Sequence, residues 1–206
     1  MYFEKCIEDM GNKKIKIYVD MDGVIADYNV GIPYNYDKKR PLSTNITKLE
    51  KVSKMENVEM HILSVSRMDE GVAQKDEWLN KYAPFFQKEN RAIIPRESNN
   101  FKSSTELKSD YVKNIERDGS VIIVIDDDCR ILKKLQEENN DVILYKDTVL
   151  VDWSTLLLGT EQKIKVYLIL GTLNFGDTWK FSNFFKCPQN SQVSPKFTKY
   201  KIFHNV

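Results

Sequence analysis

Short apolar runs separated by polar stretches recur along the first three quarters of the chain. The first, fourth and fifth runs are nearly continuous rather than alternating, as in strands of a sheet that is covered on both faces. Apolar residues at helical spacing between the later runs predict amphipathic helices. Strands that alternate with helices predict an α/β fold with a three-layer, doubly wound parallel sheet of the Rossmann-like type. The expected strands are 15–19, 60–63, 92–94, 121–125 and 142–145, and the expected helices are 69–82, 103–115 and 128–138.

The connection between the first two expected strands, 28–57, is longer than usual, and its pattern predicts one helix near 47–55. An insertion directly after the first strand lies near the carboxyl edge of a parallel sheet, where ligands bind in open α/β folds. We therefore expect a small cap there. It contains Tyr28, Tyr34 and Tyr36, whose rings either stack on a nucleobase or fill the core of the cap itself.

Acidic residues directly follow two of the expected strands. Asp20 and Asp22 come after the first strand, and residues two apart in an extended chain point to the same side. Asp126 and Asp127 come after the fourth strand, and the carboxyl ends of parallel strands share one edge of the sheet. Carboxylates held this close repel one another unless a cation joins them. Oxygen ligands suit Mg²⁺, so these four residues predict a Mg²⁺ site, while Asp128 can cap the next helix.

Composition and charge divide the chain into two parts. Hydrophobic residues make up 41% and charged residues 30%, and no run approaches ~18 apolar residues, which excludes a disordered or membrane-embedded chain. The net charge of +1 hides an uneven distribution, because 160–206 holds seven lysines and two acids, leaving −4 for 1–159. We therefore expect an acidic α/β core over 1–159 and a basic C-terminal extension over 160–206.

The extension is also rich in aromatic residues, with nine of the 23 in the chain. Over 196–203, lysines alternate with aromatic residues, a pattern that suits single-stranded nucleic acid. The same pattern suits an edge strand whose lysines oppose aggregation, in a segment that packs on the core or on a second subunit. The sequence leaves both alternatives open, and with them a dimer formed through the extension.

Cysteine usage indicates a reducing compartment. Cys6, Cys129 and Cys187 are odd in number and far apart, so they predict neither a disulfide framework nor a zinc site. The N-terminal residues are polar and lack the apolar core of a signal peptide. We therefore expect a cytoplasmic protein with no membrane partner.

The order of these motifs resembles the haloacid dehalogenase-like superfamily of aspartate-nucleophile phosphatases, over about residues 15–145. Four motifs in the right order are specific for the superfamily, whereas each alone would be weak. The matching residues are Asp20, Asp22 and Gly23 of the first motif, Ser64 of the second, Lys108 of the third, and Asp126 and Asp127 of the fourth.

A finer resemblance is to the small 5′-nucleotidase and 5′(3′)-deoxyribonucleotidase-like branch of that superfamily. It rests on the run DMDGVIAD, which begins at Asp20. It rests also on Lys75-x-x-Trp78-Leu79, in the helix after the second motif.

The resemblance implies a role for each matching residue. Asp20 is the nucleophile that forms an aspartyl-phosphate, and Asp22 is the general acid and then the base, which requires a raised pKa. Ser64 holds a phosphoryl oxygen, and Lys108 offsets negative charge on the nucleophile and the phosphoryl group. The implied Mg²⁺ ligands are Asp20, Asp22 through its main-chain carbonyl, and Asp126, with Asp127 either a ligand or a neighbour of the ligands. Which of Asp126, Asp127 and Asp128 binds the ion directly stays open.

Several of these roles have rivals nearby in the sequence. Ser66 and Arg67 follow Ser64 closely and are further candidates for binding the substrate phosphate, because an arginine can make a bidentate contact. Lys102 and Lys113 compete with Lys108 for the role of the catalytic lysine.

These observations together predict a Mg²⁺-dependent phosphomonoester hydrolase. The expected partner is a small phosphorylated metabolite, and nucleoside monophosphates are the first candidates. A nucleic acid is a less favoured partner. Two alternatives remain open: a polynucleotide end phosphatase that uses the basic extension, and a non-catalytic binding module with a phosphatase-like fold. The fold alone does not choose among them.

Overall fold

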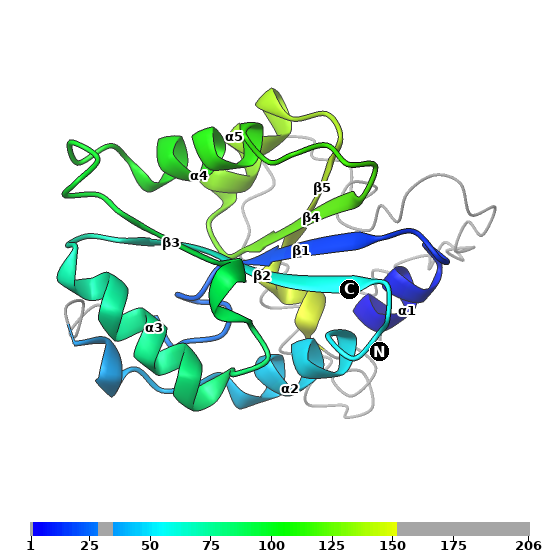
Figure 1. The fold of residues 1–206 in the computed structure, drawn as a ribbon, viewed down its shortest axis with the longest axis horizontal. Helices are drawn as coiled ribbons and strands as arrows, with labels where there is room; N and C mark the ends of the chain where they lie inside the picture. Colours follow the sequence, from blue (N-terminus) through cyan, green and yellow to red (C-terminus); the bar gives the residue numbers. More distant parts are fainter. Residues whose placement is uncertain (1, 29–34, 152–206) are drawn as a thin grey trace, which may run out of the picture. The chain divides into compact units, whose positions relative to one another are not determined.

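A sheet of five parallel strands in the order β3-β2-β1-β4-β5 forms the centre of the fold (Figure 1). The computed structural model describes residues 2–28 and 35–151. Each strand contains one of the apolar runs, so the predicted doubly wound parallel sheet is confirmed. The strands are β1 (Ile15–Val19), β2 (Val58–Ser66), β3 (Arg91–Pro95), β4 (Val121–Asp126) and β5 (Val142–Lys146).

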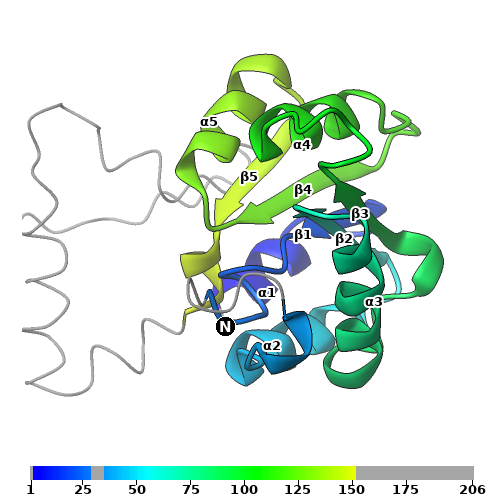
Figure 2. The ribbon, with the colours of Figure 1, turned by 90° about the vertical axis from the view of Figure 1, so that its left-hand side faces the viewer.

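Helices cover both faces of this sheet (Figures 1 and 2). On one face lie α4 (Ser104–Lys113) and α5 (Cys129–Glu138). On the other lie α2 (Ser43–Val52) and α3 (Glu70–Tyr82). A short helix, α1 (Tyr2–Glu8), precedes β1, and the 3₁₀ turns are η1 (Tyr36–Lys38), η2 (Lys88–Asn90) and η3 (Asp147–Leu150).

Alternation along the central strand fills both interfaces. Ile15, Ile17 and Val19 of β1 belong to the buried cluster on the α2 and α3 side, whereas Tyr18 packs with the cluster on the α4 and α5 side. Fully burying an aliphatic side chain of this size stabilises the fold by roughly 1.5–3 kcal/mol. Since β1 pairs with both β2 and β4, these contacts hold its carboxyl end in a fixed position between theirs.

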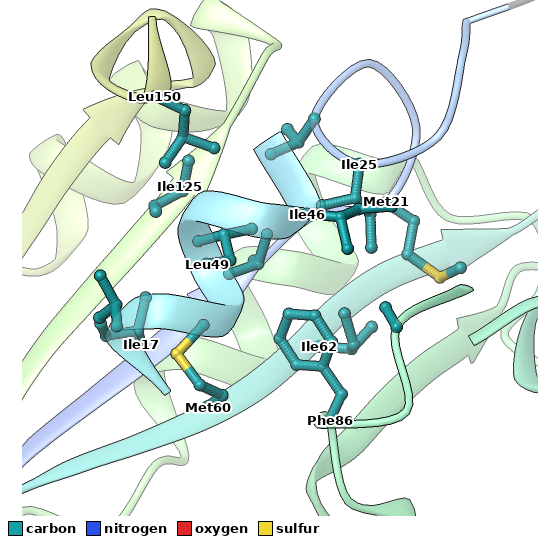
Figure 3. Packing of buried hydrophobic residues seen from close by; sticks show 14 of the residues in the cluster. Ile17, Met21, Ile25, Ile46, Leu49, Met60, Ile62, Phe86, Ile125 and Leu150 are labelled. Carbon is teal, nitrogen blue, oxygen red and sulfur yellow. The ribbon is translucent and has the colours of Figure 1, made fainter. Parts of the chain in front are cut away.

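The long connection after β1 contributes a helix to the core. The helix α2 begins at Ser43, four residues before the predicted helix, and its Ile46, Leu49 and Val52 are buried. Figure 3 shows Leu49 packed among side chains of the sheet such as Ile17. The described part of this connection therefore supplies one layer of the fold, while a cap over 28–57 remains a prediction.

The N-terminal helix α1 was not expected from its polar composition. Its Phe3 and Ile7, together with Met10 just after it, lie at helical spacing and are buried. The described residues belong to one compact unit, whereas the extension 160–206 lies outside them. In the described part of the chain, no helix is both long enough and apolar enough to cross a membrane.

Candidate active site

A tight turn places two carboxylates at the carboxyl end of β1. The amide of Asp20 donates to the carbonyl of Ile125 at 3.0 Å, which ties this residue to β4. The chain then folds back, with the carbonyl of Met21 accepting from later amides of the same turn. Gly23 has φ +79°, and a Cβ there would collide with the carboxylate of Asp127. Glycine therefore allows both the backbone reversal and the close approach of the β4 loop.

Three carboxylates converge where β1 and β4 end side by side. Asp20, Asp126 and Asp127 each offer an oxygen, and these oxygens lie within 4.8 Å of one another. Asp20 and Asp126 are buried, and Asp127 is half-buried. This group unites residues that are more than a hundred positions apart in the sequence, as the parallel sheet predicts.

A buried lysine joins two of these carboxylates. The Nζ atom of Lys108 lies 2.9 Å from Asp20 Oδ1 and 2.6 Å from Asp126 Oδ2, and its side chain is 2% exposed. The helix α4 presents this lysine from a fixed start, because Ser103 and Glu106 form a capping box at its first turn. The register of the helix therefore sets where the ammonium group lies.

The two rival lysines lie outside this cluster. Lys102 pairs with Asp110 at 3.3 Å, and Lys113 pairs with Glu138 at 2.9 Å. Both rivals are exposed to solvent. Of the three candidates, Lys108 is the lysine that the structure brings to the carboxylates.

Burial and mutual repulsion perturb the ionisation of the cluster. Burial and the charge of Asp20 raise the pKa of Asp126 to about 7, although Lys108 opposes this shift. Burial, Asp20 and Asp147 together raise the pKa of Asp127 to about 6. Burial alone would lower the pKa of Lys108, but the charges of Asp20 and Asp126 outweigh it and raise the pKa. The single ammonium group of Lys108 therefore does not neutralise the three carboxylates of the cluster.

The third acid after β4 has a structural position. Asp128 is the N-cap of α5, and its side chain accepts from the amide of Arg130 at 2.8 Å. Its hydrogen bonds with Arg130 lower the pKa of its carboxyl. The carboxylate of Asp128 is therefore engaged by the helix, while its amide donates to Asp126 Oδ1 at 2.9 Å.

Two further lysines hold Asp22. Its Oδ1 atom accepts from Lys39, and its Oδ2 atom accepts from Lys75 at 2.7 Å. Burial would raise the pKa of Asp22, but Lys75 and Lys39 outweigh burial and lower it. A general acid requires a raised pKa, but the pKa of Asp22 is lowered in the structure. The expectation of a raised pKa for Asp22 was therefore wrong for the chain without substrate. No contact with Asp22 was predicted for either lysine, although Lys75 belongs to the Lys75-x-x-Trp78-Leu79 motif.

The second motif joins the same constellation through Lys75. Ser64 is fully buried in β2, and its Oγ atom accepts from Lys75 Nζ at 2.8 Å. Ser66 is directed to the turn before α3, where its hydroxyl donates to the carbonyl of Met68 at 2.7 Å. Arg67 is exposed. Of the three expected phosphate ligands, Ser64 is the one that contacts Lys75, which also binds Asp22.

This combination of a motif order and a charged cluster has a counterpart among known families. The model of the family described as "Polynucleotide kinase PNKP phosphatase domain" matches residues 14–142. The chain belongs to this family. The resemblance to haloacid dehalogenase-like phosphatases is thereby confirmed, and the chain carries a phosphatase domain of that type.

Solved structures similar to this member of the PNKP phosphatase domain family agree on the fold. One, "Structure of the Pnkp1/Rnl/Hen1 RNA repair complex", has a TM-score of 0.52 at 14% identity and covers 66% of this chain and 43% of its own. Another, "Structure of Pnkp1/Rnl/Hen1 complex", has a TM-score of 0.53 at 15% identity and covers 66% of this chain and 46% of its own. This chain thus spans less than half of either. A search of curated proteins gave no match.

Phosphatases of this superfamily generally use Mg²⁺, and the chemistry of the cluster fits such an ion. Asp20, Asp126 and Asp127 supply three oxygen donors from two adjacent strand ends. Hard divalent cations take such ligands, and a double positive charge offsets the repulsion that raises the pKa values of Asp126 and Asp127. The Asp22 side chain faces lysines rather than this group.

No role in the site was predicted from the sequence for Lys39 or Lys75, and Tyr36 was predicted only to stack on a nucleobase or fill the core of the cap. Lys39 and Lys75 lie over the ring of Tyr36, with Nζ-to-centroid distances of 4.9 and 5.0 Å. Tyr36 is buried and packs edge-on against Trp78, with ring centroids 5.9 Å apart. Its ring therefore lies in the core, whereas Tyr28 is 66% exposed. Tyr34 lies outside the described residues.

The raised pKa of Asp127 predicts that the stability of the fold depends on pH. Without a divalent cation, wild type is expected to lose stability relative to Asp127→Asn as the pH rises from about 4 to about 6. In this window the folded state holds a proton that the unfolded carboxyl has released, so the free energy of unfolding falls with pH. Because Asp127 is half-buried, we expect a loss of about 1–2 kcal/mol.

Urea denaturation of both proteins in EDTA at several pH values measures this difference. The comparison cancels titrating groups that the two proteins share. Added Mg²⁺ should reduce the loss in wild type by binding the ionised form. A pH-independent difference between wild type and variant would contradict the raised pKa.

Proposed function

We propose that this chain is a Mg²⁺-dependent phosphatase that removes a terminal phosphate from polynucleotides through an aspartyl-phosphate on Asp20. The observation that carries the proposal is the buried Lys108, which joins Asp20 and Asp126 beside Asp127. A nucleophilic carboxylate, a fixed positive charge and a set of hard-cation ligands are what phosphoryl transfer requires. Membership of the polynucleotide kinase phosphatase family favours a polynucleotide end as the substrate.

The chemistry follows from the positions of the acids. A carboxylate oxygen of Asp20 forms a bond to phosphorus while the bond to the ester oxygen breaks. Asp22, after taking up a proton from solvent, gives that proton to the leaving oxygen. Asp22 then takes a proton from water, whose oxygen attacks phosphorus and releases inorganic phosphate and free Asp20. Lys108 stays charged throughout and offsets negative charge on Asp20 and on the phosphoryl group.

We propose Asp20, Asp126 and Asp127 as side-chain ligands of Mg²⁺, with Asp22 contributing its main-chain carbonyl. When bound, the ion supplies positive charge that stabilises the phosphoryl group in the transition state. Ser64, with Ser66 and Arg67 as further candidates, would bind phosphoryl oxygens. Ser64 has the strongest support, because it shares Lys75 with Asp22.

A nucleoside monophosphate or other small metabolite is the second candidate substrate, which the nucleotidase-like opening at Asp20 favours. A non-catalytic binding module is disfavoured, because burying Lys108 between two acids serves no evident binding purpose. We also propose a reducing, cytoplasmic location, since the three cysteines are odd in number and far apart in the sequence.

A substrate panel with wild-type protein tests this proposal. Release of inorganic phosphate is measured from 3′- and 5′-phosphorylated oligonucleotides, nucleoside monophosphates and sugar phosphates, each with Mg²⁺ and with EDTA. We expect kcat/KM to be highest for one of the oligonucleotide ends and EDTA to abolish turnover. Preference for a mononucleotide would support the second candidate, and absence of turnover on every substrate would contradict a phosphatase.

We further propose that residues 1–159 form the catalytic core and that the extension 160–206 contributes to polynucleotide binding. Replacing Lys196, Lys199 and Lys201 by Gln should weaken binding of a phosphorylated oligonucleotide. Three lost phosphate contacts should also reduce the slope of log K against log salt by about 2. Fluorescence anisotropy at several salt concentrations measures both effects.

A second triple variant controls for a general loss of positive charge. Lys13, Lys51 and Lys54 are exposed and near the opposite edge of the sheet, where strands begin. Replacing these three by Gln should leave the slope nearly unchanged. Equal slopes for both triple variants would contradict a role of the extension.

A further inference from the structure

The two lysines that hold Asp22 differ in how fully their hydrogen bonds are used. Lys75 donates to Asp22 Oδ2 at 2.7 Å, to Ser64 Oγ at 2.8 Å and to the carbonyl of Val65 at 2.9 Å. An ammonium group has three donors and no acceptor, so Lys75 is saturated. It has no proton left with which to bind a substrate.

Lys75 is also fixed in position. Its side chain is 5% exposed, and it lies on the buried face of α3 with Trp78 and Leu79. Because an ammonium cannot accept, the oxygen of Ser64 must be the acceptor in their hydrogen bond. The hydroxyl hydrogen of Ser64 is therefore available for another acceptor, such as a phosphoryl oxygen.

Lys39 is held differently. Within the described residues, its ammonium has one hydrogen-bond acceptor, Asp22 Oδ1. Its remaining contacts are with aromatic rings, at 4.9 Å from the centroid of Tyr36 and 5.9 Å from that of the exposed Tyr28. Its backbone is anchored, since its carbonyl accepts from Trp78 Nε1 at 2.9 Å. Its side chain is 6% exposed, nearly as buried as that of Lys75, but its end has fewer described hydrogen bonds to break while its Cα stays in place.

Lys39 and Lys75 together occupy the carboxylate of Asp22, so a leaving oxygen can reach it only after one of them moves. Both carboxylate oxygens are engaged by ammonium groups, yet the side chain is 24% exposed and so reachable from solvent. An entering phosphate brings negative charge that competes with Asp22 for a cation. Among the described residues, Lys39 has a single acceptor to give up, whereas Lys75 would have to break a three-way arrangement.

We propose that the two lysines have different roles toward Asp22. When substrate binds, the ammonium group of Lys39 leaves Asp22 and binds the substrate phosphate, while Lys75 stays bound to Asp22. Lys39 is then a substrate-binding residue whose movement uncovers Asp22 Oδ1, which can take up from solvent the proton that it gives to the leaving oxygen. Lys75 is a positioning residue that orients Asp22 and the Ser64 hydroxyl. This inference rests on the proposed phosphatase function.

Kinetics of Lys39→Met and Lys75→Met test the division of roles. Two substrates are compared: p-nitrophenyl phosphate, whose leaving group departs without a proton, and the phosphorylated oligonucleotide that wild type hydrolyses best. Lys39→Met should raise KM for both about 10- to 100-fold, as expected for a lost charged hydrogen bond, with kcat within about threefold. Its Ki for inorganic phosphate should rise in parallel, and Lys39→Arg should restore part of both.

Lys75→Met should show the opposite pattern. Its kcat/KM should fall at least about 100-fold on the oligonucleotide but only about 10-fold or less on p-nitrophenyl phosphate. This ratio reports the step that breaks the ester bond, and p-nitrophenolate leaves without a proton from Asp22. A merely structural role would lower both equally. Thermal melting checks folding, and Lys75→Gln, which keeps an amide donor, replaces the Met variant if that variant does not fold.

Neighbouring exposed lysines give matched controls. Lys38→Met lies next to Lys39, and Lys81→Met lies on α3 with Lys75; both should behave as wild type. A fall in kcat for Lys39→Met with unchanged KM would overturn phosphate binding by Lys39. Equal losses on the two substrates would overturn positioning by Lys75. Inactive wild type on both substrates would instead refute the proposed function itself.

Discussion

Asp20→Asn is expected to abolish Mg²⁺-dependent phosphate release, lowering kcat by at least about 10⁴-fold. The amide that replaces the carboxylate is a poor nucleophile, so no acyl-phosphate can form. The substitution is nearly isosteric, and the main-chain hydrogen bond from residue 20 to Ile125 does not involve the side chain. The fold should therefore survive, as measured by circular dichroism and thermal melting.

The covalent intermediate gives this prediction a second readout. Substrate carrying ³²P should label wild-type protein after an acid quench, and hydroxylamine, which cleaves acyl-phosphates, should remove the label. Asp20→Asn should retain no label. Asp9→Asn, at an exposed position, should label as wild type does. Full activity in Asp20→Asn would show that another residue, or water, attacks phosphorus.

Lys108→Met is expected to lower kcat by about 10²- to 10³-fold, the usual effect of removing one preorganised electrostatic contact. The lysine is the cation that separates Asp20 from Asp126, at 2.9 and 2.6 Å. Methionine fills similar space without charge, so two buried acids would face each other. The measurement is steady-state phosphate release at saturating Mg²⁺, compared with Lys102→Met and Lys113→Met.

The rival lysines discriminate between a site effect and a general effect of charge. Lys102 and Lys113 are exposed and pair with Asp110 and Glu138, so their replacement should change kcat less than about twofold. Lys108→Met should in addition bind Mg²⁺ more tightly or need it more for stability, because the carboxylates lose their resident cation. Equal activity of all three variants would contradict the assignment of Lys108.

The acidic cluster could be predicted because its signal is local and the geometry of a parallel sheet is general. Buried strands read as apolar runs, and Asp20 and Asp126 come directly after two of them. Parallel pairing then brings the two strand ends together without any knowledge of side-chain packing. The convergence of the side chains needed no further information.

The lysines around Asp22 show where such reasoning ends. Lys75 had a detectable signal, because it shares the apolar face of α3 with Trp78 and Leu79, where an unpaired charge would be costly. Lys39 had none: it follows the short turn η1 and reaches Asp22 only because the chain folds back. Tertiary contacts of irregular segments leave no periodic trace in a sequence.

The strand order has a consequence for how activity arises as the chain is made. The first strand synthesised, β1, occupies the middle of the sheet and pairs with β4, which ends at Asp126. In a nascent chain that stops before β4, only the edge of β1 that pairs with β2 can form its hydrogen bonds. Such a chain also lacks Asp126 and Asp127, so it holds no acidic cluster. Contacts this distant in sequence form late in folding. Catalytic competence should therefore appear in one late step, so that truncated products of the domain remain inert toward phosphate esters.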